Sequence, residues 1–238
     1  PDGFVSAIEQ ALLAGRIDFA VHSYKDLPTA ETPALTIAAV PTREVAHDVL
    51  VSASPLDLKS LPSNLRIGTA SPRRAAQIRR LADLTIVPIR GNVPTRIAKV
   101  TSGELGAVVL AAAGIRRLGL LLAHAIDLPI DQFVPAPAQG ALAVQARTGD
   151  AIVATLVRID DPASRRAVET ERAFLRALHA GCHTPVGAHA TVTADRIRLH
   201  GQLFTDDGAQ CFEAVGLGPD PHQLGSSLAA QLLALRGA

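Results

Sequence analysis

The sequence predicts an α/β protein that ends in a smaller α+β domain. Three observations predict this class. First, short apolar runs alternate with helical patterns through most of the 238 residues, as they do in a doubly wound sheet. Second, several of these runs lead directly into turns that contain glycine and polar residues. Third, the final apolar runs are separated only by turns, until a last helical stretch closes the chain.

The first part of the chain predicts one helix and four strands. Apolar residues at helical spacing over residues 4–14 predict the helix, and Gly15 is a suitable residue to end it. Short apolar runs predict strands at residues 17–21, 35–40, 48–52 and 65–69. A connector that contains proline and serine, residues 52–62, separates the last two strands.

A polar segment, His22–Asp26, follows the first predicted strand. Pro28 prevents simple continuation of a strand ladder, so we expect the segment to lie on the loop at the strand's carboxyl end. Ligands bind at that end of the strands in open α/β sheets. A carboxylate such as Asp26 beside Lys25 could be an acid with a tuned pKa. Taken alone, the segment is more typical of a solvated turn with an ion pair than of a site.

Arginines stand at three successive strand-to-helix junctions in the middle of the chain. The pattern predicts helices at 73–81 and 93–101, strands at 84–89 and 107–112, and a helix start or cap at 114–118. The junctions that carry arginine are residues 68–74, 90–96 and 114–117. Because the strand ends of a doubly wound sheet meet at one edge, we expect these arginines to converge on one crevice.

The first junction has the features of an anion site. Thr69 and Ser71 lie in a turn that opens a helix, and Ser71 is a good N-cap residue. Such a turn presents backbone N–H groups to an anion. Arg73 and Arg74 in the first helical turn oppose the helix dipole, which makes more sense when an anion is bound there.

Basic residues are unevenly distributed in kind and place. Only three of the 23 basic residues are lysines, and the other twenty are arginines. Between Arg66 and Arg117, nine arginines and one lysine stand against two acidic residues. Arginine binds carboxylate or phosphate with two parallel hydrogen bonds, so this window predicts a multiply anionic ligand. The alternative is a solvated helix face in an organism that favours arginine over lysine.

Composition argues against several classes of protein. A net charge of +1, six Phe and one Tyr disfavour nucleic-acid binding. No dinucleotide fingerprint or Walker motif is found, and no apolar run of about 18 residues predicts a membrane span. Two cysteines and the lack of a signal-peptide pattern predict a reduced, cytosolic setting. Because the sequence begins at Pro1 and contains no Met, we expect an incomplete amino terminus.

The last part of the chain predicts a proline-rich crossing followed by the small domain. Residues 133–140 form the crossing, and residues 141–144 predict a strand. An amphipathic helix is predicted at 162–178, three strands within 188–217, and a final helix at 221–235. This order of elements predicts a domain distinct from the α/β part.

Cys182 lies in a glycine-containing loop just after the amphipathic helix. It could be a half-buried structural thiol, or an accessible thiolate that serves as an attachment point. A metal site is not predicted, because Cys182, His179, His183 and the distant Cys211 lack a zinc spacing. A thiol protease would need an oxyanion-hole motif and a placed base, and neither is found. On chemistry alone these possibilities stay open.

Six segments, in this order and spacing, resemble the hydroxymethylbilane synthases, also called porphobilinogen deaminases: VHSYKDLPT, GTASPRR, RGNVPTR, LAAAGIRRLGL, PAQGALAVQAR and AGCHTPVGA. The resemblance covers essentially the whole chain, and its HS-x-KD and GC-x-x-P-x-G loops are specific as a pair. It implies two hinged α/β domains like those of periplasmic binding proteins, plus a small α+β third domain. On this sequence domain 1 is residues 1–43 with 139–158, domain 2 is residues 44–138, and domain 3 is residues 159–238.

The resemblance also implies an enzyme, a transferase of tetrapyrrole and heme biosynthesis. The family joins four porphobilinogen molecules head to tail with loss of ammonia, and then releases hydroxymethylbilane by hydrolysis. Its cofactor is dipyrromethane, made from the same substrate and held through a thioether by a cysteine that matches Cys182. We therefore expect porphobilinogen as the small-molecule substrate, no metal, no nucleic-acid or membrane partner, and a cytoplasmic monomer.

The resemblance assigns roles to individual residues. Asp26 matches the catalytic aspartate, whose carboxylate can accept the pyrrole N–H and stabilise the cation left when ammonia departs. The arginines that hold the cofactor and substrate carboxylates match Arg73, Arg74, Arg90, Arg96 and Arg117. Further cofactor contacts match Ser23, Lys25, Thr69, Ser71 and Gln139.

The sequence departs from the family pattern at its beginning. The family's amino-terminal segment with an Arg-x-Ser-x-Leu-Ala motif and a lysine-bearing turn before the first helix are both missing, so we expect domain 1 to be incomplete. Position 70 is alanine where a serine is common. The main alternative to the enzyme is an anion-binding protein of the same architecture without chemistry. A covalent adduct on Cys182 would distinguish the two.

Overall fold

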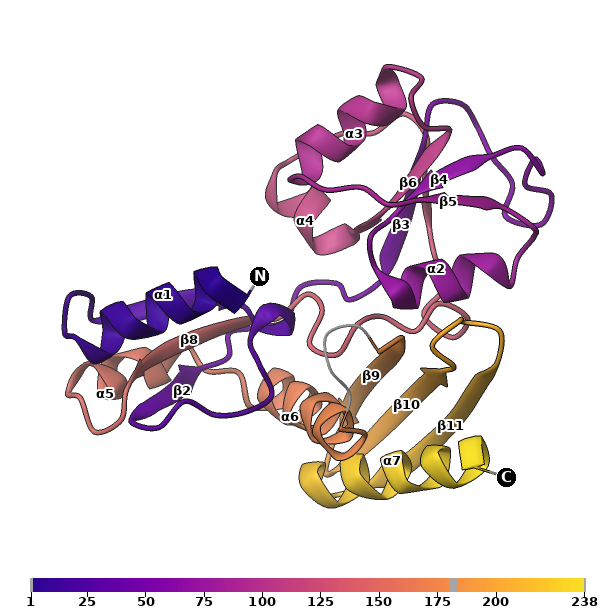
Figure 1. Ribbon diagram of the computed structural model, residues 1–238. Helices are drawn as coiled ribbons and strands as arrows, with labels where there is room; N and C mark the ends of the chain where they lie inside the picture. Colours follow the sequence, from indigo (N-terminus) through magenta and orange to yellow (C-terminus); the bar gives the residue numbers. More distant parts are fainter. Residues whose placement is uncertain (1, 180–183, 238) are drawn as a thin grey trace.

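The computed structural model describes residues 2–179 and 184–237 and arranges them around three sheets (Figure 1). Two of the sheets carry helices on both faces, and the third is an antiparallel sheet near the carboxyl end with helices on one face. The predicted fold class, α/β domains followed by a small α+β domain, is confirmed by these sheets.

The first sheet is built from strands that lie far apart in the sequence. Its order is β1 (Phe19–Ser23), β8 (Leu142–Arg147) and β2 (Leu35–Ala39), with both pairings antiparallel. Helices α1 (Asp2–Leu13) and α5 (Ile152–Leu156) cover its two faces. Successive side chains of β8 point to opposite faces of the sheet. Ala143 accordingly packs in the cluster of Val5, and Val144 packs in the cluster of Leu156.

Strand β1 extends further than the sequence predicted. His22 and Ser23 pair with residues of β8 and do not lie in the following loop, so that prediction was wrong. The physical reason is that β8 provides a partner for the polar side chain: His22 is buried and its Nε2 lies 3.1 Å from Gln145 Oε1. Burial lowers the pKa of His22. Only Tyr24–Asp26 form the turn, as a short 3₁₀ helix, η1.

The second sheet has five strands in the order β5-β4-β6-β3-β7. The strands are β3 (Asp48–Ser52), β4 (Arg66–Gly68), β5 (Thr85–Val87), β6 (Ala107–Ala111) and β7 (Ala125–Asp127). β4 is parallel to β5 and β6, whereas β3 is antiparallel to β6 and β7. The helices of this part are α2 (Pro72–Arg79), α3 (Val93–Thr101) and α4 (Ala112–Arg117).

These helices cover both faces of the second sheet, as expected for a doubly wound arrangement. Val108 of β6 points to the cluster that includes Val100 of α3 and Ile115 of α4. Val109, the next residue, points to the opposite cluster with Ile78 of α2. Because β4 is parallel to β5 and β6, the helices that follow these three strands begin at the same edge of the sheet.

The third sheet is antiparallel, with β10 (Arg196–Phe204) between β9 (Val186–Thr193) and β11 (Cys211–Gly218). Helices α6 (Pro162–Ala177) and α7 (Pro221–Gly237) pack together on one face, and their Phe174 and Leu228 enter one core with residues of the strands (Figure 1). A short 3₁₀ helix, η2 (Val157–Ile159), leads into α6.

Two chain segments cross between the first and second sheets, and they contact each other at Gly140. Glu44 N donates to Gly140 O at 3.1 Å. Gly140 has a φ of +85°, and a Cβ atom there would lie 2.5 Å from Glu44 O and 2.6 Å from Val45 O. Only glycine fits this close crossing without rearrangement.

Glu171 of α6 ties the crossing to the third sheet. Its carboxylate is fully buried and binds Arg43 with two hydrogen bonds of 2.6 and 3.0 Å. It also accepts hydrogen bonds from the backbone N–H groups of Ala138 and Ala190, at 2.6 and 2.7 Å. One carboxylate therefore joins both crossing segments to β9.

None of the helices in the described residues combines the length and the apolar character that a bilayer span requires.

Candidate functional site

A crevice of about 310 Å³ lies between the first and second sheets. Six of the residues predicted from the sequence line it: Ser23, Lys25, Asp26, Arg74, Arg96 and Arg117. The rest of the lining comes mostly from the turn before α3, from α4 and from Gly140 and Ala141 at the crossing. The predicted convergence of arginines from separate junctions is therefore seen for three of them.

The turn η1 presents its two polar residues to the crevice because its two apolar residues are buried. Tyr24 and Leu27 are 5% and 7% exposed and belong to the core next to the first sheet. Tyr24 N donates to Ala141 O at 3.0 Å, and Leu27 N donates back to Tyr24 O at 3.3 Å. The intervening Lys25 and Asp26 are left on the outer side of the turn, where they line the crevice.

Lys25 keeps much of its surface accessible, yet its environment in the crevice is electropositive. Desolvation and the nearby Arg74 guanidinium lower its pKa to about 8, against the opposing effects of Asp26 and Asp48. Its Nζ donates a long hydrogen bond of 3.4 Å to Gln139 Oε1. A lysine with this pKa is still mostly a cation at neutral pH and can bind a carboxylate.

Asp48 is a buried carboxylate that holds both arginines of the first junction. Arg73 Nη2 donates to Asp48 Oδ2 at 2.9 Å, and Arg74 Nη2 donates to Asp48 Oδ1 at 2.6 Å. Gln139 Nε2 adds a bond of 2.8 Å. Burial alone would raise the pKa of Asp48, but the guanidinium groups of Arg74 and Arg73 outweigh it and hold that pKa well below its usual range.

Arg73 and Arg74 differ in what they can reach. Arg73 is 4% exposed, its Nη1 donates to Gln77 Oε1 at 2.8 Å and to Val134 O at 3.0 Å, and it does not line the crevice. Arg74 does line the crevice. Within the described residues the buried Nε atoms of both arginines have no hydrogen-bond partner. Arg74 differs because it is held by Asp48 and also lines the crevice.

Arg96 and Arg117 reach the crevice from α3 and α4. Asn92 caps α3, because its side chain accepts from Thr95 N at 2.9 Å, and Arg96 Nε donates to Gly91 O at 2.7 Å. Burial and the Arg74 charge lower the pKa of Arg96. Arg117 lies in the last turn of α4, since residues 114–118 end and cap that helix, which is the second of the two predicted possibilities.

The remaining predicted contacts lie around the crevice without lining it. Ser71 caps α2 by accepting from Arg74 N at 3.4 Å, and Thr69 Oγ1 accepts from Ser71 N at 3.1 Å. Gln139 is buried and accepts from Lys25 and Arg74. Arg90 is exposed between β5 and α3. Cys182 lies outside the described residues.

Sequence reasoning missed Asp48. The only signal for it was a charged residue at the start of an otherwise apolar strand, which indicates a paired buried charge. No group of His, Cys, Asp and Glu suited to a metal occurs within residues 2–179 and 184–237.

The fold and the crevice together define a class: a protein of α/β domains with a cationic binding cleft and one carboxylate in its lining. The family models for the "Porphobilinogen deaminase, dipyromethane cofactor binding domain" and the "Porphobilinogen deaminase, C-terminal domain" match residues 2–155 and 166–234. The chain therefore belongs to the porphobilinogen deaminase family. It is accordingly a transferase, a hydroxymethylbilane synthase that assembles porphobilinogen on a dipyrromethane cofactor.

Individual relatives agree with the family models. The chain is 47% identical to porphobilinogen deaminase 1 of Streptomyces coelicolor, over 97% of this chain and 78% of that protein. It is 46% identical to the porphobilinogen deaminase of Mycobacterium tuberculosis, over 98% of this chain and 79% of that protein. Among solved structures, an ancestral cationic amino acid solute-binding protein is 17% identical with a TM-score of 0.41, over 63% of this chain and 64% of that one. The fold class is shown by the three sheets themselves.

Proposed function

We propose that the crevice is the active site of the deaminase and that Asp26 is its catalytic residue. The observation that carries the proposal is the meeting of Asp26 and Lys25 with Arg74, Arg96 and Arg117 in one cavity. The four cations suit a ligand with several carboxylates, and the one carboxylate suits a reaction that forms a cation. The same geometry does not by itself require chemistry, but the family match disfavours the alternative of a binding protein without activity.

The residues of the crevice fit dipyrromethane, because each of its pyrrole rings carries an acetate and a propionate. Arg74, Arg96, Arg117 and Lys25 supply separated cations, and Arg74 Nε is a donor without a partner in the described residues. When bound, the cofactor supplies the terminal ring whose free α-carbon is extended. We assign its attachment to Cys182, and further contacts to Ser23, Thr69, Ser71 and Gln139.

Two of the predicted arginines, Arg73 and Arg90, do not line the crevice. Arg73 contacts Asp48 and not the crevice, so in our proposal it acts on bound carboxylates through Asp48 and Arg74. Arg90 is exposed near the turn before α3 and would meet only a chain that extends beyond the crevice. We propose that it serves the later additions.

Asp26 acts on the substrate's charge. Loss of ammonia from the aminomethyl group of porphobilinogen leaves a cation shared with the pyrrole nitrogen. The Asp26 carboxylate can accept the pyrrole N–H and stabilise that charge, and afterwards can take the proton released when the new bond forms. Lys25 pairs with a ligand carboxylate and is not a nucleophile in this scheme.

We further propose the division into three domains at residues 43/44, 138/139 and 158/159, with residues 1–43 and 139–158 forming one domain. The two crossing segments that meet at Gly140 support the first two boundaries. A cytoplasmic monomer remains our prediction from the sequence.

The attachment site is tested by intact mass. We expect freshly purified protein to carry an added mass of two pyrrole units on Cys182, and Cys182→Ser to lack it. Cys211→Ser is the matched control, because Cys211 lies half-buried in a strand of the third sheet. An unmodified Cys182 in active protein would contradict the assignment.

The role of Asp26 is tested by Asp26→Asn, which keeps the shape and removes the charge. We expect the adduct to form as before and porphobilinogen consumption to fall by about 10²-fold or more, since general acid–base groups contribute about that much. Asp18→Asn, an exposed aspartate just before β1, should keep wild-type turnover. If Asp26→Asn consumes porphobilinogen at the wild-type rate, another group must carry the proton.

A further inference from the structure

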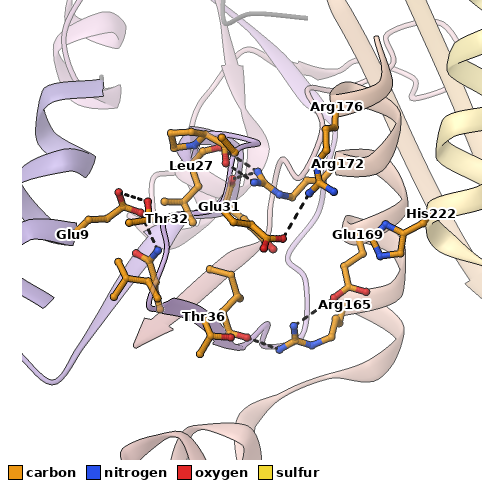
Figure 2. Close-up of a pocket in the computed structure, with 16 residues that line it drawn as sticks. Glu9, Leu27, Glu31, Thr32, Thr36, Arg165, Glu169, Arg172, Arg176 and His222 are labelled. Carbon is orange, nitrogen blue, oxygen red and sulfur yellow. Dashed lines mark hydrogen bonds and ion pairs between the residues drawn. The ribbon is translucent and has the colours of Figure 1, made fainter. Parts of the chain in front are cut away.

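The turn η1 has two sides, and the side away from the crevice faces a different domain. Lys25 and Asp26 line the crevice, whereas Tyr24, Leu27 and Pro28 line a second cavity of about 250 Å³. Helix α6 forms the opposite wall of this cavity, so the third sheet's domain approaches the turn from behind (Figure 2).

Arg172 of α6 spans this space to the backbone of the turn. Its Nη1 donates to Leu27 O at 3.1 Å and to Tyr24 O at 3.4 Å, and its Nη2 donates to Pro28 O at 2.5 Å. The guanidinium carbon lies 4.6 Å from the centroid of the Tyr24 ring. Figure 2 shows the side chain directed from α6 to the chain around Leu27.

The chemistry of these contacts suits a clamp. Leu27 O and Pro28 O follow the helical turn, where carbonyl groups lack intrahelical partners and need a donor from elsewhere. The planar guanidinium can bind several of them at once and also stack on an aromatic face. Arg172 is 9% exposed, so water competes little for its hydrogen bonds. In the described part of the chain it forms no ion pair with a carboxylate. Its charge is satisfied by the turn.

Apolar packing and the Arg172 contacts both join the turn to α6. Val168 of α6 lies in the same buried cluster as Tyr24 and Leu27. Beside this cluster the cavity leaves space between the turn and α6 unfilled, and there Arg172 supplies the polar contacts to the backbone of the turn. The neighbouring Glu171 is itself fixed to both crossing segments and to β9, which anchors α6. Arg172 therefore extends from a rigid support.

We propose that Arg172 is a positioning residue for Asp26, with Tyr24 as its stacking partner, so that the carboxyl-terminal domain sets the geometry of the catalytic turn. This inference rests on the role of Asp26 proposed above. It predicts that loss of the clamp misplaces the carboxylate without removing any group that touches the substrate.

The test compares Arg172→Gln with Arg166→Gln. Arg166 lies on the same helix and also donates to three backbone carbonyls, those of Ala194, Asp195 and Pro219, but all of them belong to the carboxyl-terminal domain. In Arg172→Gln we expect kcat to fall about tenfold or more with KM changed less than about twofold, because small misplacements of catalytic groups have effects of that size. Arg166→Gln should keep the wild-type kcat. Intact mass must show the same fraction of protein with the adduct in each variant.

Amide hydrogen exchange gives a readout that does not depend on activity. We expect faster exchange in peptides that cover residues 24–32 in Arg172→Gln, and not in Arg166→Gln, since exchange reports local opening. Arg172→Lys, which keeps the charge but loses the fork, should fall between Gln and wild type. If Arg172→Gln does not fold, Tyr24→Leu removes the stacked ring while it keeps an apolar side chain in the core, and it should change exchange and kcat in the same direction by about twofold to threefold.

The outcomes separate this inference from the proposed function. Normal exchange and normal kcat in Arg172→Gln, beside an inactive Asp26→Asn, would overturn the positioning role alone. Equal losses in Arg172→Gln and Arg166→Gln would also overturn it, because they indicate a general effect on α6. An active Asp26→Asn would overturn the role of Asp26 and, with it, the inference.

Discussion

Lys25 shows how strongly a single residue in the crevice depends on its neighbours. Its pKa is lowered to about 8 from an ordinary value of 10.5, first by desolvation and then by the Arg74 charge. The ammonium group is therefore present below pH 8 and lost as the pH rises above it. A carboxylate ligand bound by Lys25 will be held less firmly on the alkaline side of that value.

This titration can be measured in Cys182→Ser, where no adduct should cover the crevice. We expect acylation of Lys25 by an amine-selective reagent, followed by peptide mass spectrometry, to reach half its maximal rate near pH 8. In Arg74→Gln the midpoint should move upward, because the cation that disfavours the ammonium is gone. The unfolded chain, with a midpoint near 10.4, is the reference. If the midpoint in the folded protein equals that of the unfolded chain, the crevice does not change the pKa of Lys25.

At the residue scale, the sequence predicted which side chains would be cationic in the site, but not how they are held. Arg74, Arg96 and Arg117 line the crevice as expected, because each stands near a strand-to-helix junction. Arg73 precedes Arg74 directly and therefore points elsewhere, into the protein. No local pattern connects Asp48 with Arg73 and Arg74, since their pairing depends on how β3 and α2 pack.

At the scale of elements, α2 is a helix whose first turn is stabilised from outside. Arg73 and Arg74 near its amino end oppose the helix dipole. Asp48, at the start of β3, supplies the negative charge that this end favours. This buried cluster contains one carboxylate and two guanidinium groups, so it also leaves a net positive charge beside the crevice.

Asp48→Asn tests this arrangement. Removing one partner of a buried ionic cluster leaves uncompensated charge, so we expect the free energy of unfolding in urea to fall by about 3–5 kcal/mol. The depressed pKa of Asp48 means that its contribution is present above the unfolded value near 3.8 and is lost as the pH falls toward the folded value. The loss in Asp48→Asn should therefore be full at neutral pH.

Asp83→Asn is the matched control, because Asp83 is exposed between α2 and β5. It should change the unfolding free energy by less than about 0.5 kcal/mol. If the unfolding free energies of Asp48→Asn and Asp83→Asn agree within about 0.5 kcal/mol, Asp48 is not needed to hold α2.

The elements themselves were predicted best where periodicity was strong and worst where they were short. The pattern predicted α3 at residues 93–101 and β3 at 48–52 with the bounds that the structure has. β7 and α5 were missed, because three residues of mixed polarity and one turn and a half of helix give no periodic signal. Both depend on packing against neighbours that are distant in the sequence.

At the scale of the whole molecule, the crossing at Gly140 links the two α/β domains. Gly140 combines a φ of +85° with carbonyl oxygens of the other segment at 2.5 and 2.6 Å from the position of a Cβ atom. Any side chain there must push the crossing segments apart. Because the crevice lies between these domains, such a change also alters the spacing of the site.

Gly140→Ala should therefore destabilise the protein by about 3 kcal/mol, from left-handed strain and overpacking together. Gly149→Ala is a matched control, because Gly149 has a similar φ of +78° but no atom within 4 Å of the Cβ position. It should show only the left-handed strain, about 1–2 kcal/mol. Thermal unfolding of both variants measures the difference, and equal melting temperatures would mean that the crossing can relax.

The order of strands in the first sheet has a consequence for how the protein is made. β8 lies between β1 and β2 and, in the described part of the chain, is the strand with which each of them pairs, so this sheet cannot form until residues 142–147 have left the ribosome. The strands of the second sheet all come from residues between β3 and β7, so it can assemble before that. We therefore expect synthesis and folding to run in different orders, with the second sheet folded while β1 and β2 still lack β8.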